Sequence, residues 1–382
     1  MSEGLLRAAV VGTGFVGPFH VDAVRRAGYG EVVAVVGSNE ERTRRRATAL
    51  GVALGTTDLG AVLDDPRIDV VHVCTPNASH VEIARRVLQA GKHVMVEKPL
   101  ALNRADARAL VQFAGECGRH AAVAFTYRGY PMVRRARATV AAGDLGDVRL
   151  IHGAYLQDWL AEETDFNWRL ESTAGQSRAV ADIGSHWFDT VEHVSRRRIS
   201  AVLAEFATFM PNRQRPATQG AAFEAGAGER ELVPIESEDA AVILLRFEDG
   251  ARGSVVVSQV SPGRKNAFTF ELAGSRASMA WAQEEPERLW IGTRGDQRVL
   301  QRGQAPADVG VPSLPAGHPE GWAEALRDLV RDFYKAVASG TPPGPDEQYP
   351  TLIDGARAVS LVEAVVESSR TGEWTIVEEG SW

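Results

Sequence analysis

The sequence predicts an α/β chain of two domains, a first domain built on a parallel sheet and an α+β domain with a large, mostly antiparallel open sheet. The chain has 382 residues, more than one hydrophobic core usually supports. Short apolar runs alternate with helical segments up to residue 125, and longer alternating runs follow. We therefore expect the domains at 1–127 and 128–382.

The first domain is predicted from strands that alternate with helices. Such alternation is typical of parallel βαβ units. The expected strands are 6–11, 32–36, 70–74, 93–96 and 121–125, and the expected helices are 21–27, 40–50, 81–90 and 105–114, the last capped by Asn103.

The second domain begins with a short helix at 133–141 and a glycine turn at 143–146. Period-two alternation then predicts half-buried strands, as in an antiparallel sheet. These strands are 148–155, 199–209, 240–247, 253–260, 268–273 and 278–282, and helices are expected at 322–338 and 352–367. Residues 211–236, which contain several prolines and glycines, are expected to form an irregular insertion.

Composition excludes several classes of function. The formal net charge of −8 argues against a nucleic-acid partner, because such partners are held by clustered Lys and Arg. The chain has only two cysteines without metal-ligand spacing, which predicts no disulfide framework and no metal site. With neither a leader pattern nor an apolar stretch of about 20 residues, we expect a cytoplasmic protein without a membrane partner.

A glycine-rich turn, Gly12–Gly17, follows the first expected strand and precedes a helix. Gly12 permits the tight turn, Gly14 lets a pyrophosphate approach the backbone, and Gly17 allows close helix–strand packing. The pattern alone is weak, but among repeated βαβ units it predicts a dinucleotide site rather than an ordinary glycine turn. The expected contacts are Gly12, Thr13, Gly14, Phe15, Val16 and Gly17.

The end of the second strand bears on which nicotinamide cofactor is used. An acid that binds the adenosine ribose usually stands there, but this chain has Gly37 and Ser38, followed by Asn39. Arg42 could stack on adenine or face solvent. Asn39 could bind the ribose hydroxyl, so the sequence leans slightly to NAD and leaves NADP open.

Polar residues also follow the later strands of the parallel sheet, where doubly wound sheets bind ligands. Thr75, Pro76, Asn77 and His80 are candidate cofactor contacts, although Asn77 would serve equally well as a helix cap. The fifth strand ends in Glu97–Pro99, which contains Lys98 and for which we expect a cis peptide bond before the proline.

Four motifs in order give the chain a family resemblance: Gly12–Gly17, Thr75–Asn77, Glu97–Pro99 and Asp182–His186. Together they resemble the Gfo/Idh/MocA dehydrogenases, the family of glucose–fructose oxidoreductase and inositol dehydrogenase. The resemblance implies a Rossmann domain, then a domain whose open sheet forms a homodimer or homotetramer interface. It also implies Lys98, Asp182 and His186 as catalytic residues.

The chemistry of these three residues suits oxidation of an alcohol, which needs a base for the hydroxyl proton and a nicotinamide to accept the hydride. His186 is suited to be the base, but Lys98 could act as the base or could stay charged and stabilise the developing alkoxide. Asp182 would orient His186 or bind a neighbouring hydroxyl. If both lie on one helix, their spacing of four residues puts them on one face.

Further candidates lie in a polar, aromatic stretch of the second domain. Gln157, Asp158 and Trp159 offer the amide, carboxylate and aromatic groups that hold sugars, and Tyr127 joins them as a candidate substrate contact. The remaining expected cofactor contacts are Glu97, Lys98, Arg128, Trp168 and Arg169. These segments resemble the levoglucosan dehydrogenase and sugar 3-dehydrogenase subgroup, although Trp159 and Trp168 could equally be core or interface residues.

The sequence thus predicts an NAD(P)-dependent oxidoreductase that converts a secondary ring hydroxyl of a sugar or anhydro sugar to a ketone. An inositol dehydrogenase would perform the same reaction on a carbocycle. NAD-assisted glycoside cleavage and a non-catalytic nucleotide-binding regulator are also compatible with the motifs.

Overall fold

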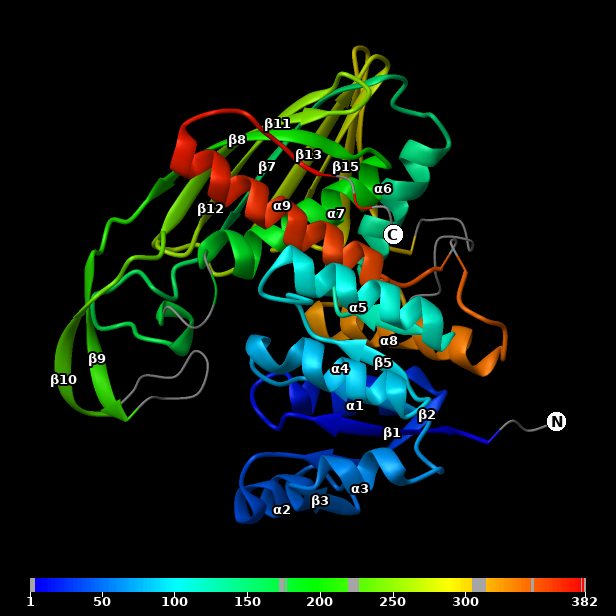
Figure 1. Ribbon diagram of the computed structural model, residues 1–382. Helices are drawn as coiled ribbons and strands as arrows, with labels where there is room; N and C mark the ends of the chain where they lie inside the picture. Colours follow the sequence, from blue (N-terminus) through cyan, green and yellow to red (C-terminus); the bar gives the residue numbers. More distant parts are fainter. Residues whose placement is uncertain are drawn as a thin grey trace. The chain divides into compact units, whose positions relative to one another are not determined.

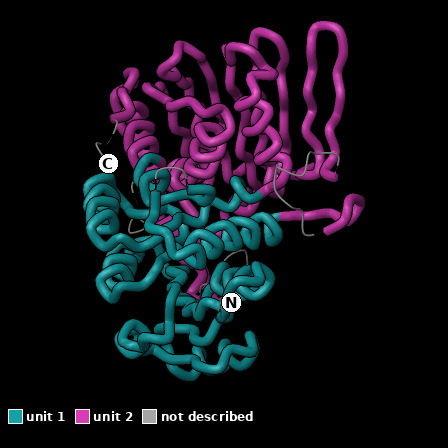
Figure 2. Tube along the Cα trace, turned by 90° about the vertical axis from the view of Figure 1, so that its right-hand side faces the viewer, with its two compact units in different colours: residues 1–129, 322–357, 380–382 teal, residues 130–321, 358–379 magenta. Residues whose placement is uncertain are grey.

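The computed structural model describes residues 4–171, 175, 177–218, 227–303, 314–344, 347–378 and 380. It forms two compact units, one of residues 1–129, 322–357 and 380–382, the other of residues 130–321 and 358–379 (Figure 2). This division differs from the expected domain 128–382, because 322–357 belong to the first unit. The reason is that helix α8 (Trp322–Ala338) buries Leu326, Val330 and Phe333 in the core of that unit, in contact with α1 (Gly17–Ala27).

Within the described residues, the first unit contains a six-stranded parallel sheet in the order β3-β2-β1-β4-β5-β6. Its strands are β1 (Leu6–Val11), β2 (Gly30–Val36), β3 (Leu54–Thr56), β4 (Val70–Val73), β5 (His93–Val96) and β6 (Ala121–Val123). The strand order reverses between β1 and β4, so the turns after these two strands flank the point at which doubly wound sheets bind ligands.

Helices connect these strands and confirm the parallel βαβ prediction (Figure 1). They are α1, α2 (Glu40–Ala49), α3 (Leu59–Asp64), α4 (His80–Gln89) and α5 (Arg104–Cys117), with short turns η1 (Asn77–Ser79) and η2 (Thr126–Gly129). The Asn103 side chain accepts a hydrogen bond from the Asp106 N–H at 2.9 Å, which confirms it as the cap of α5. Strand β3 and helix α3 were not expected, because both are too short for a clear periodic pattern.

The second unit contains a nine-stranded sheet among its described residues, in the order β16-β15-β14-β13-β7-β12-β11-β8-β17. Within that sheet as described, only β7 and β12 run parallel, which confirms the mostly antiparallel prediction. The strands are β7 (Val148–Leu156), β8 (Ile199–Ala207), β11 (Ala240–Phe247), β12 (Arg252–Ser258), β13 (Ala267–Gly274), β14 (Ala277–Ala282), β15 (Arg288–Thr293), β16 (Gln297–Gln301) and β17 (Thr375–Ile376).

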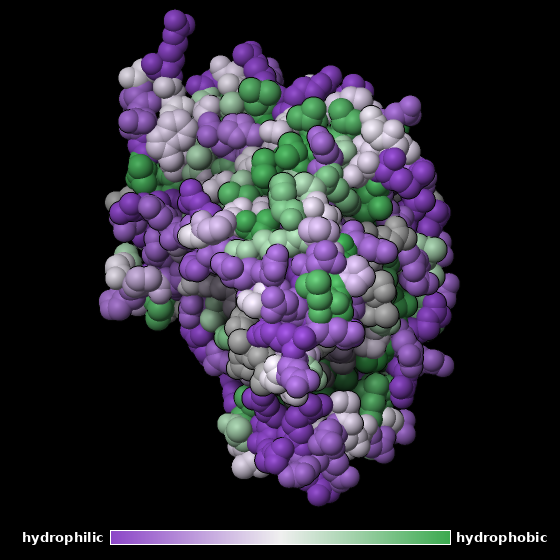
Figure 3. Space-filling view, turned by 90° about the vertical axis from the view of Figure 1, so that its left-hand side faces the viewer, coloured by the Kyte–Doolittle hydropathy of each residue, from purple (hydrophilic) through white to green (hydrophobic). Residues whose placement is uncertain are grey.

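The two faces of this sheet differ in exposure. Along β11, Ile243 and Leu245 are buried on the face that α6 (Pro131–Ala141) and α7 (Ser185–Ser195) cover (Figure 1). Val242 and Leu244 alternate with them and remain exposed on the other face. Figure 3 shows a part of the molecular surface on which hydrophobic residues gather among hydrophilic ones. The last helix, α9 (Leu352–Thr371), runs four residues beyond its expected end.

The expected irregular insertion at 211–236 contains regular structure. Strands β9 (Asn212–Thr218) and β10 (Ala227–Pro234) pair as an antiparallel ribbon, and residues 219–226 between them lie outside the described residues. The prediction of an irregular segment was wrong for both strands. Prolines mark strand ends and edges as well as loops, and here Pro234 ends β10.

Membrane-spanning helices and metal clusters are absent from the described part of the chain. In the ranges that the structure describes, no helix is long and apolar enough to cross a membrane. The same ranges contain no group of three or more His, Cys, Asp or Glu side chains placed to hold a metal ion.

Candidate active site

The glycine turn between β1 and α1 has the geometry of a phosphate cradle. Gly12 has φ = +103°, and a Cβ there would lie 2.3 Å from the Cys74 carbonyl oxygen, so glycine is required. A Cβ on Gly17 would lie 2.2 Å from the Gly12 oxygen. At Gly14 a Cβ would meet nothing within 4 Å, so this backbone borders open space. Gly12 and Gly17 thus have the steric roles expected of them, and approach of a pyrophosphate to Gly14 stays a prediction.

The N-terminus of α1 is also suited to an anion. Among the described residues no side chain caps this helix, Pro18 stands in its first turn, and that turn carries no acidic residue. Backbone N–H groups at such an end attract negative charge. Together with the open space at Gly14, this arrangement fits the pyrophosphate of a nicotinamide dinucleotide.

At the end of β2, the structure brings together Ser38, Asn39 and Arg42. Asn39 Oδ1 accepts the Arg42 N–H at 2.9 Å and so caps α2, and Arg42 Nη2 donates to Ser38 Oγ at 3.1 Å. All three residues are exposed. No carboxylate follows the strand directly, so hydroxyl, amide and guanidinium groups are the ones available to an adenosine ribose.

After β4, Thr75, Pro76 and Asn77 form the turn that leads into α4. Ser79 Oγ donates to Pro76 O at 2.8 Å, which stabilises this turn. His80 is fully buried, and its two ring nitrogens lie 2.8 Å from the carbonyl oxygens of Thr75 and Pro99. His80 therefore links the turns after β4 and β5 through its two ring nitrogens. It positions these turns and is not the direct cofactor contact that we expected.

Lys98 lies two residues beyond β5, next to a buried carboxylate. Glu97 is 8 % exposed; its Oε2 accepts the Lys98 N–H at 3.1 Å, and its Oε1 lies 2.9 Å from Nε2 of the fully buried His20. His20 Nδ1 lies 2.8 Å from His72 Nδ1, and His72 Nε2 lies 2.9 Å from the Tyr334 hydroxyl. A buried polar chain thus supports the Lys98 backbone. The Lys98–Pro99 peptide bond is cis, as expected.

The two candidate residues in η2, Tyr127 and Arg128, both have contacts within the first unit. Tyr127 is 2 % exposed, which places it in the core of the first unit. Arg128 Nη2 lies 2.9 Å from Asp354 Oδ1. Burial raises the pKa of Asp354, but Arg128 and Thr351 lower it more, so the pKa stays below its ordinary value. Arg128 is therefore held by an ion pair within its own unit.

In the second unit, Asp182 and His186 lie on consecutive helical turns. Asp182 belongs to a π-helical turn, η5 (Val180–Gly184), closed by a hydrogen bond from the Ser185 N–H to the Val180 oxygen. His186 follows in α7 and is 8 % exposed. A π turn is wider than an α turn, and such turns are frequent at functional sites. We expected Asp182 and His186 to lie one ordinary α-helical turn apart, but the turn that carries Asp182 is π-helical and therefore wider.

The tryptophan beside His186 fixes α7 to the sheet. Trp187 is fully buried and donates from Nε1 to the Thr269 oxygen at 2.9 Å. A Cβ on Gly153 would lie 2.8 Å from that Nε1. Glycine in β7 therefore lets the helix approach closely, and His186 is carried on a rigidly packed turn.

Both carboxylate oxygens of Asp182 have a donor. Arg169 Nε lies 3.3 Å from Oδ1, and Gln259 Nε2 donates to Oδ2 at 2.9 Å. Arg169 comes from η3 (Trp168–Leu170), and its guanidinium also stacks 4.5 Å from the Trp168 ring centre. The structure thus places Arg169, which we expected at the cofactor, against the candidate catalytic carboxylate.

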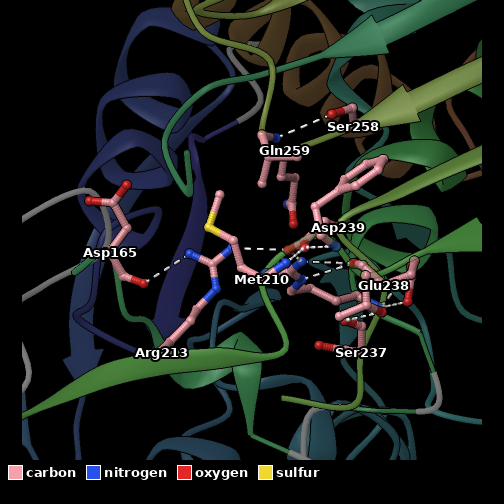
Figure 4. A network of polar contacts seen from close by, with 12 residues as sticks. Asp165, Met210, Arg213, Ser237, Glu238, Asp239, Ser258 and Gln259 are labelled. Atoms are coloured by element: carbon pink, nitrogen blue, oxygen red, sulfur yellow. Dashed lines mark hydrogen bonds and ion pairs between the residues drawn. The ribbon is translucent and has the colours of Figure 1, made fainter. Parts of the chain in front are cut away.

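A buried charged network supports this arrangement (Figure 4). Glu238 accepts hydrogen bonds from Ser177 Oγ at 2.7 Å and from the N–H of Val180 at 3.0 Å, at the start of the turn that carries Asp182. The next residue, Asp239, pairs with Arg178 and with Arg213, the latter at 2.9 Å. Glu238, Asp239 and Gln259 were not predicted from the sequence. The available signal was that Glu238 and Asp239 stand directly before β11 and Gln259 directly after β12.

The polar, aromatic segment after β7 is also ordered. Gln157 Oε1 accepts from Trp159 Nε1 at 2.9 Å, and its Nε2 donates to Asn266 Oδ1 at 2.9 Å. Asp158 lies 2.6 Å from Lys265 Nζ, and this hydrogen-bonded ion pair holds the pKa of Asp158 below its ordinary value. Gln157 and Trp159 are thus joined to each other, and Asp158 is joined to Lys265.

Sequence comparisons agree with this geometry over most of the chain. Residues 6–125 match the oxidoreductase family with an NAD-binding Rossmann fold, Gfo/Idh/MocA, and residues 133–280 match the C-terminal domain of the same family. Levoglucosan dehydrogenase of Pseudarthrobacter phenanthrenivorans is 32 % identical over 353 residues, which cover 90 % of this chain and 88 % of that protein.

Solved structures give the same result. A levoglucosan dehydrogenase in complex with NADH and L-sorbose has a TM-score of 0.88 and 29 % identity, covering 99 % of this chain and 100 % of that one. An inositol dehydrogenase homologue complexed with NAD⁺ from Azotobacter vinelandii has a TM-score of 0.85 and 28 % identity, covering 97 % of each chain. This chain therefore belongs to the Gfo/Idh/MocA family of oxidoreductases, with an NAD-binding Rossmann domain in its first unit.

Proposed function

We propose that this chain is an NAD-dependent dehydrogenase that oxidises a secondary ring hydroxyl of a sugar or anhydro sugar to a ketone. The observation that carries the proposal is the Asp182 carboxylate, held on both oxygens and followed one turn later by His186. Lys98 in the Glu97–Pro99 segment completes the catalytic set that the family resemblance implies. Similarity to a levoglucosan dehydrogenase, over 90 % of this chain, supports a sugar-like substrate.

The cofactor site proposed here lies at the carboxyl ends of β1, β2, β4 and β5. The turn Gly12–Gly17 and the uncapped start of α1 would hold the pyrophosphate, and Ser38, Asn39 and Arg42 would face the adenosine ribose. Thr75–Asn77 would border the remaining part of the cofactor. When bound, NAD supplies the acceptor for the hydride of the alcohol carbon.

Three side chains would act on the substrate hydroxyl. A base must take its proton, and His186 or Lys98 can do this; a charged Lys98 would instead stabilise the developing alkoxide. Asp182 would bind an adjacent hydroxyl or orient His186. Gln157, Asp158 and Trp159 are proposed as further substrate contacts because of their amide, carboxylate and aromatic groups.

A panel of sugars, anhydro sugars and inositols, followed by NADH absorbance, tests the proposal. We expect NAD reduction with at least one pyranose-like polyol, and a loss of about 10²–10⁴-fold in kcat/KM for Lys98→Ala and His186→Ala. Lys335→Ala, on the exposed side of α8, should leave the rate unchanged. Inactivity of the wild type on every polyol, or an unchanged rate for Lys98→Ala, would overturn the proposal.

An inositol dehydrogenase is the second candidate. The similarity to an inositol dehydrogenase homologue complexed with NAD⁺ favours it. A carbocycle has no ring oxygen, so the two candidates separate by comparing kcat/KM for levoglucosan and myo-inositol in the same assay.

The assembly is part of the same proposal. Val242, Leu244, Val256 and Leu150 are 40–54 % exposed on one face of the nine-stranded sheet. An apolar face of this kind suits a homodimer or homotetramer. Light scattering would measure the oligomer size, and a monomer would exclude this part of the proposal. The cytoplasmic location also remains a prediction.

A further inference from the structure

Gln259, directly beyond β12, lies beside the candidate catalytic carboxylate. Its side chain is fully buried, and Nε2 donates to Asp182 Oδ2 at 2.9 Å. An ionised carboxylate only accepts hydrogen bonds, which fixes the orientation of the amide. The amide oxygen therefore points away from the Asp182 contact and can accept a hydrogen bond from another group.

The amide oxygen of Gln259 has no hydrogen-bond partner among the residues that the structure describes. A buried acceptor left without a donor is destabilising, and such groups are rare in folded proteins. A hydroxyl is the donor that a polyol offers. An apolar ligand carries no donor for this atom, so the amide oxygen favours a ligand that carries hydroxyl groups.

The backbone of Gln259 is held on both sides. Its N–H donates to the Asp239 oxygen at 3.1 Å, and its carbonyl accepts from the Leu160 N–H at 3.2 Å. The Asp239 carboxylate in turn pairs with Arg178 and Arg213, both with fully buried side chains. Figure 4 shows Gln259 beside this network, with Arg213 pointing toward Asp239.

The neighbouring residues Glu238 and Asp239 fix the positions of Asp182 and Gln259, the two partners of this contact. Glu238 accepts hydrogen bonds from the N–H groups of Arg178 and Val180 at 3.0 Å, at the start of the turn that carries Asp182. Asp239 holds the backbone of Gln259. Because Glu238 and Asp239 are joined by one peptide bond, the separation between Asp182 and Gln259 is fixed by a short, rigid connection.

We propose that Gln259 is both a positioning residue and a substrate-binding residue. Its amide nitrogen orients the Asp182 carboxylate, and its amide oxygen accepts a hydrogen bond from a hydroxyl of the polyol next to the one oxidised. This inference rests on the proposed function, since it names a contact of that substrate. A site that pairs with a hydroxyl discriminates against an analogue that lacks it, because the buried acceptor is then left without a donor.

Two variants and a matched control test the inference. Gln259→Glu keeps an acceptor but places a second carboxylate against Asp182, whereas Gln259→Leu removes both ends of the amide. The control, Gln297→Glu, makes the same chemical change at an exposed residue of β16. The assay measures kcat and KM against pH, for the preferred sugar and its mono-deoxy analogues.

We expect Gln259→Leu to lose about 10–100-fold in kcat/KM. For one deoxy analogue the penalty seen in the wild type should disappear in Gln259→Leu, which a structural defect would not produce. In Gln259→Glu the acid limb of the kcat/KM profile should move up by about one pH unit or more, because two adjacent carboxylates cannot both ionise readily. Among the described residues, Arg169 from η3 pairs with Asp182, and the titratable His186 lies on the following turn of helix; neither changes between the variants.

Two outcomes separate the inference from the proposed function. If the wild type oxidises sugars but the acid limb and the deoxy penalties are the same in all variants, the role of Gln259 is wrong and the function stands. If the wild type oxidises no polyol, the function and the hydroxyl contact fail together, and unfolding by urea still tests the positioning contact. Gln259→Glu should then unfold at lower urea than the wild type at pH 7, and Asp182→Asn added to it should restore stability by reversing donor and acceptor. A double variant no more stable than Gln259→Glu would overturn the positioning contact as well.

Discussion

The buried pair of His20 and Glu97 beneath the Lys98 backbone makes the stability of this protein depend on pH. Their Nε2 and Oε1 atoms lie 2.9 Å apart, with the two side chains 0 % and 10 % exposed. Burial lowers the pKa of His20, but the Cys74 and Glu97 side chains together raise it to about 10. Because burial raises the pKa of the Cys74 thiol, Glu97 is the charge that matters near neutral pH. Replacement of Glu97 by Gln should therefore remove the charge that keeps His20 protonated.

The size and sign of the effect follow from these shifts. A histidine whose pKa rises from 6.5 to about 10 on folding contributes stability that is complete below pH 6.5 and is lost as pH rises toward 10. The whole shift sets an upper limit of about 4 kcal/mol at pH 7 and about 1 kcal/mol at pH 9, at about 1.4 kcal/mol per pKa unit. Cys74 accounts for part of that shift, so the share that Glu97→Gln removes is smaller than this limit. Burial raises the pKa of Glu97, but His20 lowers it more, so its contribution is present above pH 4.5 and is lost on acidification.

Urea unfolding of the wild type and Glu97→Gln at several pH values between 5 and 9 measures this difference. The wild type should be more stable by the largest margin at pH 5–6.5, and the margin should shrink steadily toward pH 9. Glu82→Gln is the matched control, because Glu82 is 76 % exposed and its pair with Arg86 is 4.0 Å long, so a change below about 0.5 kcal/mol is expected. A margin that does not vary with pH would refute the charged state of His20.

Three further predictions concern the glycine turn, the ribose end and the buried network. Gly14→Ala should weaken NAD binding about tenfold or more at unchanged stability, because its Cβ would enter the open space beside the glycine turn. Gly17→Ala should instead lower the free energy of unfolding by about 1–3 kcal/mol through overpacking. Calorimetry measures the binding and urea titration the stability, and Gly115→Ala in α5 is the control for both. Arg42→Gln should change NAD affinity less than about twofold but weaken NADP binding several-fold, since a guanidinium at the ribose attracts only the 2′-phosphate; equal effects on both cofactors in titrations would contradict this. Asp239→Asn should lower the free energy of unfolding by about 3–5 kcal/mol, because two buried guanidinium groups lose their carboxylate, and an unchanged urea midpoint would show that the network is dispensable.

Local patterns predicted most of the first unit. Glycine spacing, strand ends and apolar periodicity are properties of short segments. The sequence therefore predicted that Gly12–Gly17 follows the first strand and that Lys98 follows the strand ending at Val96, as the structure has them. The placement of α8 was not found, because an amphipathic helix does not show from its own sequence which core it packs against.

The candidate site of the second unit was predicted only in part. Asp182 and His186 stand in one motif, but the donors to Asp182 come from far along the chain, Gln259 being 77 residues away. Sheet register decides which strand end lies beside η5, and register depends on long-range pairing that a single sequence does not display. The π-helical turn was missed for the same reason, since the carboxylate of Glu238 fixes its start from 58 residues away.

The buried charges around Asp239 are better explained by positioning than by stability. Removing two guanidinium groups and a carboxylate from water has a large desolvation cost, and apolar side chains of similar volume often give equal or greater stability. Apolar contacts are non-directional, however, whereas each hydrogen bond to Asp239 or Glu238 fixes a direction at a defined length. Burial raises the pKa of Asp239, and its N–H donors and the two arginines lower it more, so the carboxylate stays ionised and keeps all its donors. A network of this kind holds η5 and the Gln259 backbone in one relative position, which is what a carboxylate that must meet a substrate hydroxyl requires.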